Sequence, residues 1–210
     1  MADVAGILAA VALAYLLGSF PAGYLLGRLR GVNVLEWGSG RTGGTNVLRS
    51  AGVLPALATG AIDVGKGALA VWLAGRIAPQ GYQALAQVLG GVAVILGHNH
   101  SVFLGFRGGA GVGTSLGALS VIYWPAAVAL LVLLLVVIAI TRYASVGSLT
   151  VTTLMPIILL ALALAGILAP TYVGYGLIAW AIIVYSHRSN IYRLIEGTER
   201  RIGEGGHPRS

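Results

Sequence analysis

The chain has 210 residues, of which 57% are hydrophobic and only 9% are charged, and its mean hydropathy is +0.89. Because a soluble domain carries about a quarter of its residues as charged side chains, this composition predicts an integral membrane protein. The absence of cysteine excludes disulfides and thiolate metal sites. The net charge is +7, but the basic residues are scattered between apolar runs, a pattern that does not indicate nucleic-acid binding.

The first apolar run, residues 4–26, is expected to be a retained membrane span, because it lacks a basic N-terminal region and is too long for the apolar core of a signal peptide. Further spans are predicted near residues 56–78, 83–104, 111–124, 126–141, 148–167 and 171–186. We predict two spans within 111–141, because a single helix there would be about 48 Å long against about 30 Å of hydrocarbon. One long segment kinked at Trp124-Pro125 and a total of five spans are the alternatives.

The arginines set the expected orientation. Those that follow the first, third, fifth and seventh spans are Arg28, Arg30, Arg41, Arg49, Arg107, Arg142, Arg188, Arg193, Arg200, Arg201 and Arg209. Arg76 alone lies near a turn on the other side. Since basic residues are retained in cytoplasmic loops, we predict the N-terminus outside and the C-terminus in the cytoplasm. The expected fold is an all-α, seven-helix membrane protein, a single domain over 1–210 with a flexible cytoplasmic tail over roughly 200–210.

A polar segment, GSGRTGGTN (38–46) followed by Arg49, falls on the predicted cytoplasmic side. Its glycines let backbone N–H groups approach an anion, and its hydroxyls and arginines can complete the set of ligands. The alternative is a flexible charged loop that only determines topology. The candidate ligands are Gly38, Ser39, Gly40, Arg41, Thr45, Asn46 and Arg49.

A second polar segment, GHNHSVFLGFRGGAGVGTS (97–115), ends in a glycine-rich turn before a predicted helix. Such a turn can bind phosphate, although glycine pairs are also packing contacts in membrane helices. His98 and His100 would lie about 200° apart on a helix, so no metal site is predicted, and a hydrogen-bonded interfacial histidine is the simpler interpretation. The candidate substrate-binding residues are His98, Ser101, Gly108, Gly109 and Gly111.

Two more polar segments fall on the same side. RYASVGS (142–148) offers an arginine and two serines for a pocket, or only a topology anchor with a helix cap. In HRSNIYRLIEGTE (187–199), His187, Asn190 and Arg193 recur every three residues and share a helix face, unless the segment is a solvated amphipathic tail.

Asp63 and Lys66 lie three residues apart within the predicted second span. Charges inside a span are costly and are usually paired. We therefore predict a structural ion pair near the cytoplasmic end of that span.

These motifs, in this order, resemble the bacterial acyl-phosphate:glycerol-3-phosphate acyltransferases, the PlsY family. The matching stretches are GSFPAGYLLGRL (18–29), GSGRTGGTNVLRSAG (38–52), IDVGKG (62–67), GHNHSVFLGFRGGAGVGTSLG (97–117), RYASVGS (142–148) and HRSNIYRLIEGTE (187–199). The resemblance implies a monomeric seven-helix enzyme of the bacterial cytoplasmic membrane. It would move a fatty acyl group from acyl phosphate to the 1-hydroxyl of glycerol 3-phosphate, the first acylation of phospholipid synthesis. The implied products are lysophosphatidate and inorganic phosphate, and neither a metal nor an organic cofactor is implied.

The resemblance also implies roles. Ser39 and Arg49 would hold the acyl phosphate and the developing charge, and the 108–111 turn would be the glycerol-phosphate loop. The residues expected to line the pocket are Arg142, Ser145, His187 and Asn190, with Glu199 in a structural position. His187 and Asn190 are counted with the catalytic residues, and His187 is the candidate general base, unless a substrate phosphate oxygen takes the proton. Acyl phosphate is already activated, so positioning and charge stabilisation can suffice.

The chain departs from the family pattern at Gly43-Gly44-Thr45, where GAT is usual, and, more importantly, at two positions that change the charge. The glycine turn usually reads GGKG but here has Ala110, and the first motif usually reads GSGN but here has Arg41. One cation is lost and one is gained, so we hypothesise that Arg41 takes over the anion contact vacated at Ala110. Other interpretations are an acyltransferase with a different acceptor or donor, a non-catalytic relative that binds phospholipid precursors, and a transporter of a phosphorylated solute. The transporter is disfavoured because the polar groups lie on one face.

Overall fold

The computed structural model describes residues 2–204. The α-helices are α1 (Ala2–Ser19), α2 (Ala22–Leu29), α3 (Gly44–Ala51), α4 (Val53–Ile77), α5 (Gln83–Asn99), α6 (Val112–Thr141), α7 (Ala144–Leu164), α8 (Thr171–Ser186) and α9 (Arg188–Ile195), and the 3-10 helices are η1 (Val34–Glu36) and η2 (Val102–Leu104). Among these described residues, four stretches are long and apolar enough to cross a membrane, Val4–Leu29, Val53–Ile77, Val112–Thr141 and Ala144–Leu164, and Thr171–Ser186 is a shorter apolar helix. The predicted all-α architecture is confirmed.

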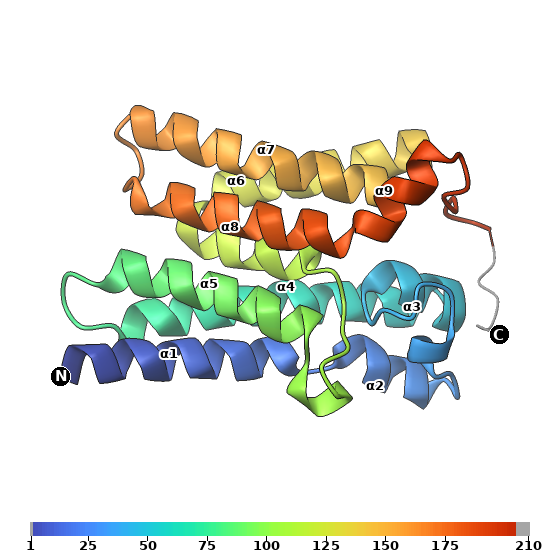
Figure 1. Cartoon of the computed structure of the whole chain (residues 1–210), viewed down its shortest axis with the longest axis horizontal. Helices are drawn as coiled ribbons and strands as arrows, with labels where there is room; N and C mark the ends of the chain where they lie inside the picture. The colour runs from blue at the N-terminus through green and yellow to red at the C-terminus, as the bar shows by residue number, and fades with distance from the viewer. Residues whose placement is uncertain (1, 205–210) are drawn as a thin grey trace.

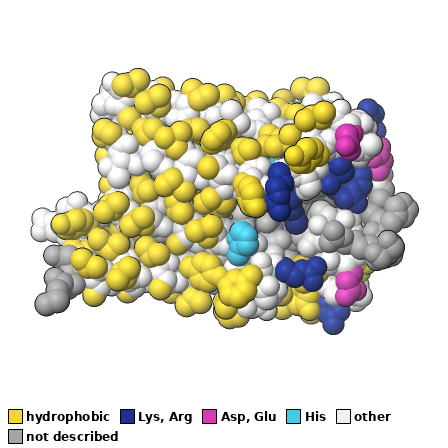
Figure 2. Space-filling model, viewed as in Figure 1, with side chains coloured by type: hydrophobic (Ala, Val, Ile, Leu, Met, Phe, Trp, Pro, Cys, Tyr) yellow, Lys and Arg dark blue, Asp and Glu magenta, His cyan; other side chains and the backbone are white. Residues whose placement is uncertain are grey.

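The long helices form a bundle with two unlike ends. The short helices α2, α3 and α9 gather at the end where the described chain finishes, and the N-terminus lies at the other end (Figure 1). Hydrophobic side chains cover the flank of the bundle, whereas charged side chains gather around α2, α3 and α9, which we call the polar end (Figure 2). An apolar flank around helices that satisfy their own backbone hydrogen bonds is what a hydrocarbon environment requires.

The first predicted span, 4–26, is not one continuous helix. Helix α1 stops at Ser19, because Pro21 has no N–H to continue the hydrogen-bond ladder and moves Phe20 away from the helical conformation. The ammonium of Lys66 donates to the Phe20 carbonyl at 3.1 Å, and this bond satisfies one of the carbonyls that the break releases. The break turns α2 into a separate helix at the polar end.

The third predicted span, 83–104, also ends early, at Asn99. The chain forms a short 3-10 turn and reverses at Gly105, whose φ of 58° is in the left-handed region that favours glycine. This reversal brings Arg107 back beside Ser101 in an isolated antiparallel bridge. The glycine-rich turn that follows is thereby placed against the end of α5.

Helix α6 consists of two segments that separate at Tyr123, which has extended backbone angles (φ −158°, ψ 91°). Pro125 suits the first turn of the second segment, where its missing N–H needs no partner. The two segments run in opposite directions (Figure 1), and Gly113 and Ile138 line the same cavity. In a straight helix these two residues would lie about 38 Å apart. The predicted break in 111–141 is therefore confirmed.

Helices α4 and α6 cross in close contact. A Cβ at Gly67 would lie 2.1 Å from the Thr114 carbonyl oxygen, and a Cβ at Gly117 would lie 1.9 Å from the Val64 carbonyl oxygen. Only glycine fits at these two positions, as is typical where membrane helices approach closely. The crossing holds the N-terminal turn of α6 beside the part of α4 that carries Asp63.

Candidate active site

A cavity of about 210 Å³ lies at the polar end. Its walls come from the 38–46 segment, α3, α4, the glycine-rich turn, both segments of α6, α7 and the region around α9. The predicted site residues that it brings together are Ser39, Arg41, Thr45, Asn46, Arg49, Asp63, His98, Gly111, Ser145, His187, Asn190 and Glu199. Polar motifs that are far apart in the sequence therefore meet around one cavity.

Asn46 folds the 38–46 segment. Its buried Nδ2 donates to three backbone carbonyls at 2.9–3.1 Å, and its Oδ1 accepts from the Ser39 N–H at 3.1 Å. The chain turns with φ of 52° at Gly38 and 68° at Gly40, a conformation that favours glycine. Asn46, Gly38 and Gly40 thus shape the segment and place Ser39 on the cavity wall.

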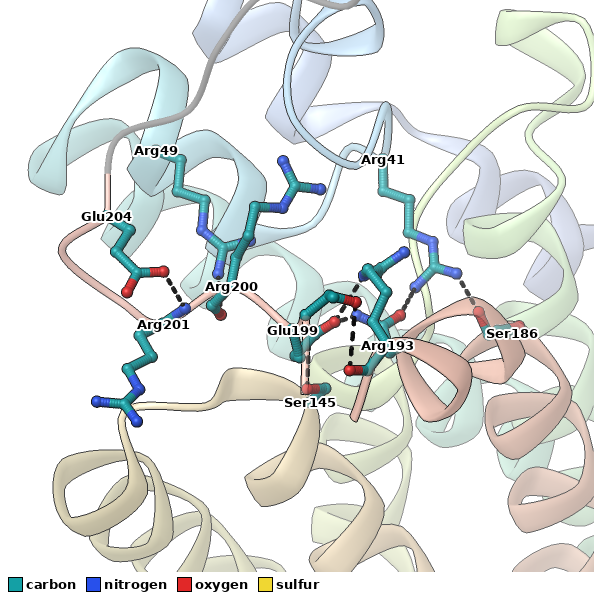
Figure 3. Close-up of polar contacts among 11 residues, drawn as sticks. Arg41, Arg49, Ser145, Ser186, Arg193, Glu199, Arg200, Arg201 and Glu204 are labelled. Atoms are coloured by element: carbon teal, nitrogen blue, oxygen red, sulfur yellow. Dashed lines mark hydrogen bonds and ion pairs between the residues drawn. The ribbon is translucent and has the colours of Figure 1, made fainter. Parts of the chain in front are cut away.

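Two arginines on the wall have neutral hydrogen-bond partners. Arg49 donates from Nη2 to the Arg200 carbonyl at 3.0 Å, and its buried Nε has no partner among the described residues. Arg41 donates to Asn190 Oδ1 at 3.2 Å and to the Ser186 carbonyl (Figure 3). Burial lowers the pKa of both guanidinium groups, and neighbouring arginines lower it further. A pair of cations in such surroundings favours the binding of anions.

The glycine-rich turn packs on the end of α5. The Gly109 N–H donates to the His98 carbonyl at 2.9 Å, and a Cβ on Gly109 would lie 2.0 Å from His98 Nε2. Gly111, with φ of 89°, precedes α6, and residues 111–113 face the cavity. The free N–H groups and the dipole at such a helix end favour a phosphate. Ala110 lies on the same wall, where its methyl group adds no charge.

Three titratable side chains form a buried cluster beside the cavity. Lys66 Nζ lies 2.8 Å from Asp63 Oδ1, so the predicted ion pair is confirmed. His98 Nδ1 lies 2.8 Å from the same ammonium and 3.4 Å from the same carboxylate oxygen. The cluster connects α4 to α5 and, through the Phe20 carbonyl, to the break after α1. It therefore supports the wall on which the glycine-rich turn rests.

His187 lies between α8 and α9 and faces the cavity. Its Nδ1 lies 2.8 Å from the Ile183 carbonyl oxygen. Because a carbonyl can only accept, this nitrogen carries the proton and Nε2 keeps a lone pair. Burial lowers the pKa of the imidazole below its ordinary value. A neutral ring with one free nitrogen can accept a proton from a substrate.

Glu199 joins three side chains around the cavity. Its carboxylate accepts from Ser145 Oγ at 2.9 Å, Asn190 Nδ2 at 2.8 Å and Arg193 Nε at 2.7 Å (Figure 3). Burial alone would raise the pKa of this carboxyl, but the hydrogen bonds from Asn190, Arg193 and Ser145 hold it below its ordinary value. The ionised carboxylate thus ties the start of α7 to α9.

Several predicted ligands lie outside this cavity. Contrary to the prediction, Ser101 is buried elsewhere and donates to the Ser19 carbonyl at 2.5 Å. Arg142 is exposed and donates to the Ile202 carbonyl instead of pointing inward. Gly108 and Gly109 line a second cavity of about 200 Å³, which shares Arg41 with the first.

The predicted flexible tail is bound to the body over its first part. The Ile202 N–H donates to the Arg142 carbonyl at 2.7 Å, and Arg201 Nε donates to Tyr143 Oη at 3.1 Å. Residues 205–210, the rest of the predicted tail, lie outside the described residues.

Some wall residues carry no signal in the sequence. Leu134 and Ile138 line the cavity from the second segment of α6, but they are apolar residues within an apolar run. The carbonyl of Arg200 holds Arg49, and a main-chain group has no residue-type signature. Ser148, by contrast, is one of the two serines that the RYASVGS motif offers for a pocket, and it lines the cavity one turn after Ser145 on α7.

The chain is similar over nearly its whole length to one family of membrane enzymes. A family model described as glycerol-3-phosphate acyltransferase matches residues 8–197. Curated relatives of that name include one from Synechococcus sp. (strain CC9902), 44% identical over 93% of this chain and 95% of the relative, and one from Thermus thermophilus, 43% identical over 91% and 93%.

Solved structures extend the similarity to the fold. The crystal structure of PlsY, an integral membrane glycerol 3-phosphate acyltransferase, in its glycerol 3-phosphate form matches with a TM-score of 0.84 at 34% identity over 94% of this chain and 96% of that chain. The lysophosphatidic acid form matches with a TM-score of 0.81 at 34% identity over 93% and 94%. This chain therefore belongs to the glycerol-3-phosphate acyltransferase family.

Proposed function

We propose that this protein transfers a fatty acyl group from acyl phosphate to the 1-hydroxyl of sn-glycerol 3-phosphate. The products would be lysophosphatidate and inorganic phosphate. The observation that carries the proposal is the cavity in which Ser39, Arg49, His187 and Asn190 meet the N-terminal turn of α6. The forms in which PlsY was crystallised, with glycerol 3-phosphate and lysophosphatidic acid, name one substrate and one product of this reaction.

The proposed reaction needs places for two phosphate groups. We assign the phosphate of glycerol 3-phosphate to the 108–111 turn where it meets the start of α6, because the N–H groups of the first helical turn are free to bind an anion. We assign the acyl phosphate to Ser39 and Arg49, with Arg41 as a further cation on the same wall. Leu134 and Ile138, on the second segment of α6, give the cavity an apolar wall, to which we assign the start of the acyl chain.

In the transfer, the 1-hydroxyl oxygen forms a bond to the acyl carbonyl carbon, and the bond from that carbon to the bridging phosphate oxygen breaks. Phosphate leaves with the bonding electrons. The hydroxyl proton goes to His187 Nε2, which the bond to Ile183 leaves free, or to an oxygen of the departing phosphate. Ser39 and Arg49 would stabilise the negative charge that develops on the acyl phosphate, and Asn190 would hold Arg41 beside it. The donor is already a mixed anhydride, so no acyl-enzyme is required.

We also propose that the bundle crosses the bacterial cytoplasmic membrane seven times, through α1, α4, α5, the two segments of α6, α7 and α8. The N-terminus would lie outside and the polar end in the cytoplasm. The arginines that follow alternate spans support this orientation, and the apolar flank supports the embedding. We also propose that the protein acts as a monomer, as the resemblance to the family implies.

The test is turnover of palmitoyl phosphate and glycerol 3-phosphate by the purified protein, with inorganic phosphate and lysophosphatidate measured together. We expect both products in equal amounts, and a loss of about a hundredfold or more in Ser39→Ala and in Arg49→Ala. Ser189→Ala and Arg30→Ala change exposed residues of the same types and are the matched controls. A folded protein that forms neither product, or that forms lysophosphatidate equally well in Ser39→Ala and Arg49→Ala, would refute the proposal.

A further inference from the structure

Residues 199–202, here called the strap, lie across the polar end against α3 and the start of α7 (Figure 3). The strap is pinned at both ends. At its first residue, the Glu199 carboxylate bonds to Ser145, Asn190 and Arg193. At its last residue, Ile202 bonds to Arg142.

The bonds between Arg142 and Ile202 are reciprocal. The guanidinium donates to the Ile202 carbonyl from Nη2 at 2.8 Å and from Nε at 3.2 Å, and the Ile202 N–H donates to the Arg142 carbonyl at 2.7 Å. Arg142 has φ of 62°, a left-handed conformation that glycine or asparagine would adopt more readily. The two side-chain bonds to the strap account for an arginine at this junction of α6 and α7.

Between the two pins, the strap presents the carbonyl of Arg200 to Arg49. This carbonyl accepts a hydrogen bond from Arg49 Nη2 at 3.0 Å. Within residues 4–204, the Arg49 side chain makes no other hydrogen bond. Among the residues that the structure describes, the buried Arg49 Nε has no partner. A long flexible side chain held at one atom takes its direction from that contact. The direction of the Arg49 guanidinium therefore depends on where the strap lies.

We infer that Arg142 is a positioning residue for acyl transfer. It lies outside the cavity, fixes the strap at Ile202, and through the Arg200 carbonyl orients Arg49 toward the reacting anion. The inference rests on the proposed function and extends it, because it makes the C-terminal segment part of the active site.

A double-mutant cycle on the full-length protein tests this chain of contacts. Arg142→Ala is expected to lower kcat about tenfold, the effect of one misplaced charge-assisted hydrogen bond, with little change in KM for glycerol 3-phosphate. In an Arg49→Lys background, Arg142→Ala should lower kcat by less than about twofold, because the guanidinium on which it acts is gone. Arg30→Ala, an exposed arginine at the end of α2, is the matched control. Arg142→Lys keeps the charge and a single donor nitrogen and should recover part of the loss.

Losses that multiply in the double variant would overturn the inference, since Arg142 would then act independently of Arg49. Wild-type kcat in Arg142→Ala would overturn it as well. If Arg142→Ala does not yield folded protein, Arg142→Met, which keeps the bulk of the side chain but has no donor, goes through the same cycle with the same criteria. If the wild type has no turnover, the proposed function fails first, and the cycle is measured on the dissociation constant of palmitoyl phosphate, the anion assigned to Arg49. Additive effects there would overturn the inference separately.

Discussion

Replacing Glu199 with glutamine removes the negative charge but keeps the size of the side chain at the point where α7, α9 and the strap meet. The carboxylate accepts three hydrogen bonds of 2.7–2.9 Å, and the residue is only 8% exposed. The amide keeps one oxygen but turns an NH2 group toward donors that need an acceptor. A hydrogen bond to a charged group contributes about 1.5–3 kcal/mol. The Arg193 side chain is 30% exposed, so solvent reduces its share. We expect Glu199→Gln to lower the free energy of unfolding by about 2–3 kcal/mol.

Thermal unfolding in detergent measures this loss, which corresponds to about 4–12 °C in Tm for a chain of this size. Glu204→Gln, at an exposed glutamate in the same part of the chain, is the matched control. Because the folded pKa of Glu199 is lowered, its contribution is complete above the ordinary glutamate pKa of about 4.3 and is lost as pH falls through the folded pKa. Wild type and variant should therefore converge in acid. Equal Tm values at neutral pH, or a difference that is the same at every pH, would refute the assignment.

Three further changes test the cavity itself. His187→Ala should lower turnover about 10²–10⁴-fold if the imidazole is the base, whereas a loss under about tenfold would assign the proton to a phosphate oxygen. Because burial lowers the pKa of His187, the acid limb of kcat/KM should lie below pH 6.5, and a limb above that value would contradict a buried base. Arg41→Asn should lower kcat/KM about ten- to a hundredfold, and adding Ala110→Lys should restore it. Unchanged turnover in Arg41→Asn alone would refute the hypothesis that Arg41 replaces the lysine missing at position 110. Gly109→Ala places a Cβ 2.0 Å from a buried histidine ring and should raise KM for glycerol 3-phosphate, whereas Gly174→Ala, with open space around its Cβ, should not.

Apolar runs predict where the helices lie but not where they break. The length of an apolar run predicts a helix because a chain segment in hydrocarbon must satisfy its own backbone hydrogen bonds, and a helix does so. The breaks depend on local chemistry that hydropathy does not register. Pro21 interrupts a run that remains apolar on both sides, and α5 ends at Asn99 although the span was predicted to continue to residue 104. At Tyr123, by contrast, the excess length of the run together with the following proline predicted the reversal.

The residues around the cavity were predictable where a polar motif resembles that of the family. Ser39, Arg49, His187 and Asn190 meet in one cavity, as their motifs indicate. Residue type does not show which way a side chain points, and Arg142 demonstrates the limit. The left-handed turn between α6 and α7 directs it outward to the strap, and only the three-dimensional course of residues 199–202 reveals that partner.

The charges around the cavity connect its structure to the proposed reaction. Asp63 is paired with Lys66 at 2.8 Å and Glu199 with Arg193 at 2.7 Å, so both carboxylates on the wall are neutralised. Within residues 4–204, Arg41 and Arg49 have only neutral hydrogen-bond partners, and the end of α6 adds a partial positive charge. Acyl phosphate and glycerol 3-phosphate carry two phosphate groups into this field, and lysophosphatidate and inorganic phosphate carry two out. The positive charge of the cavity therefore favours the binding of substrates and of products alike. The direction of transfer must come from the mixed anhydride, and the rate must come from how closely Ser39, Arg49 and His187 fit the transition state.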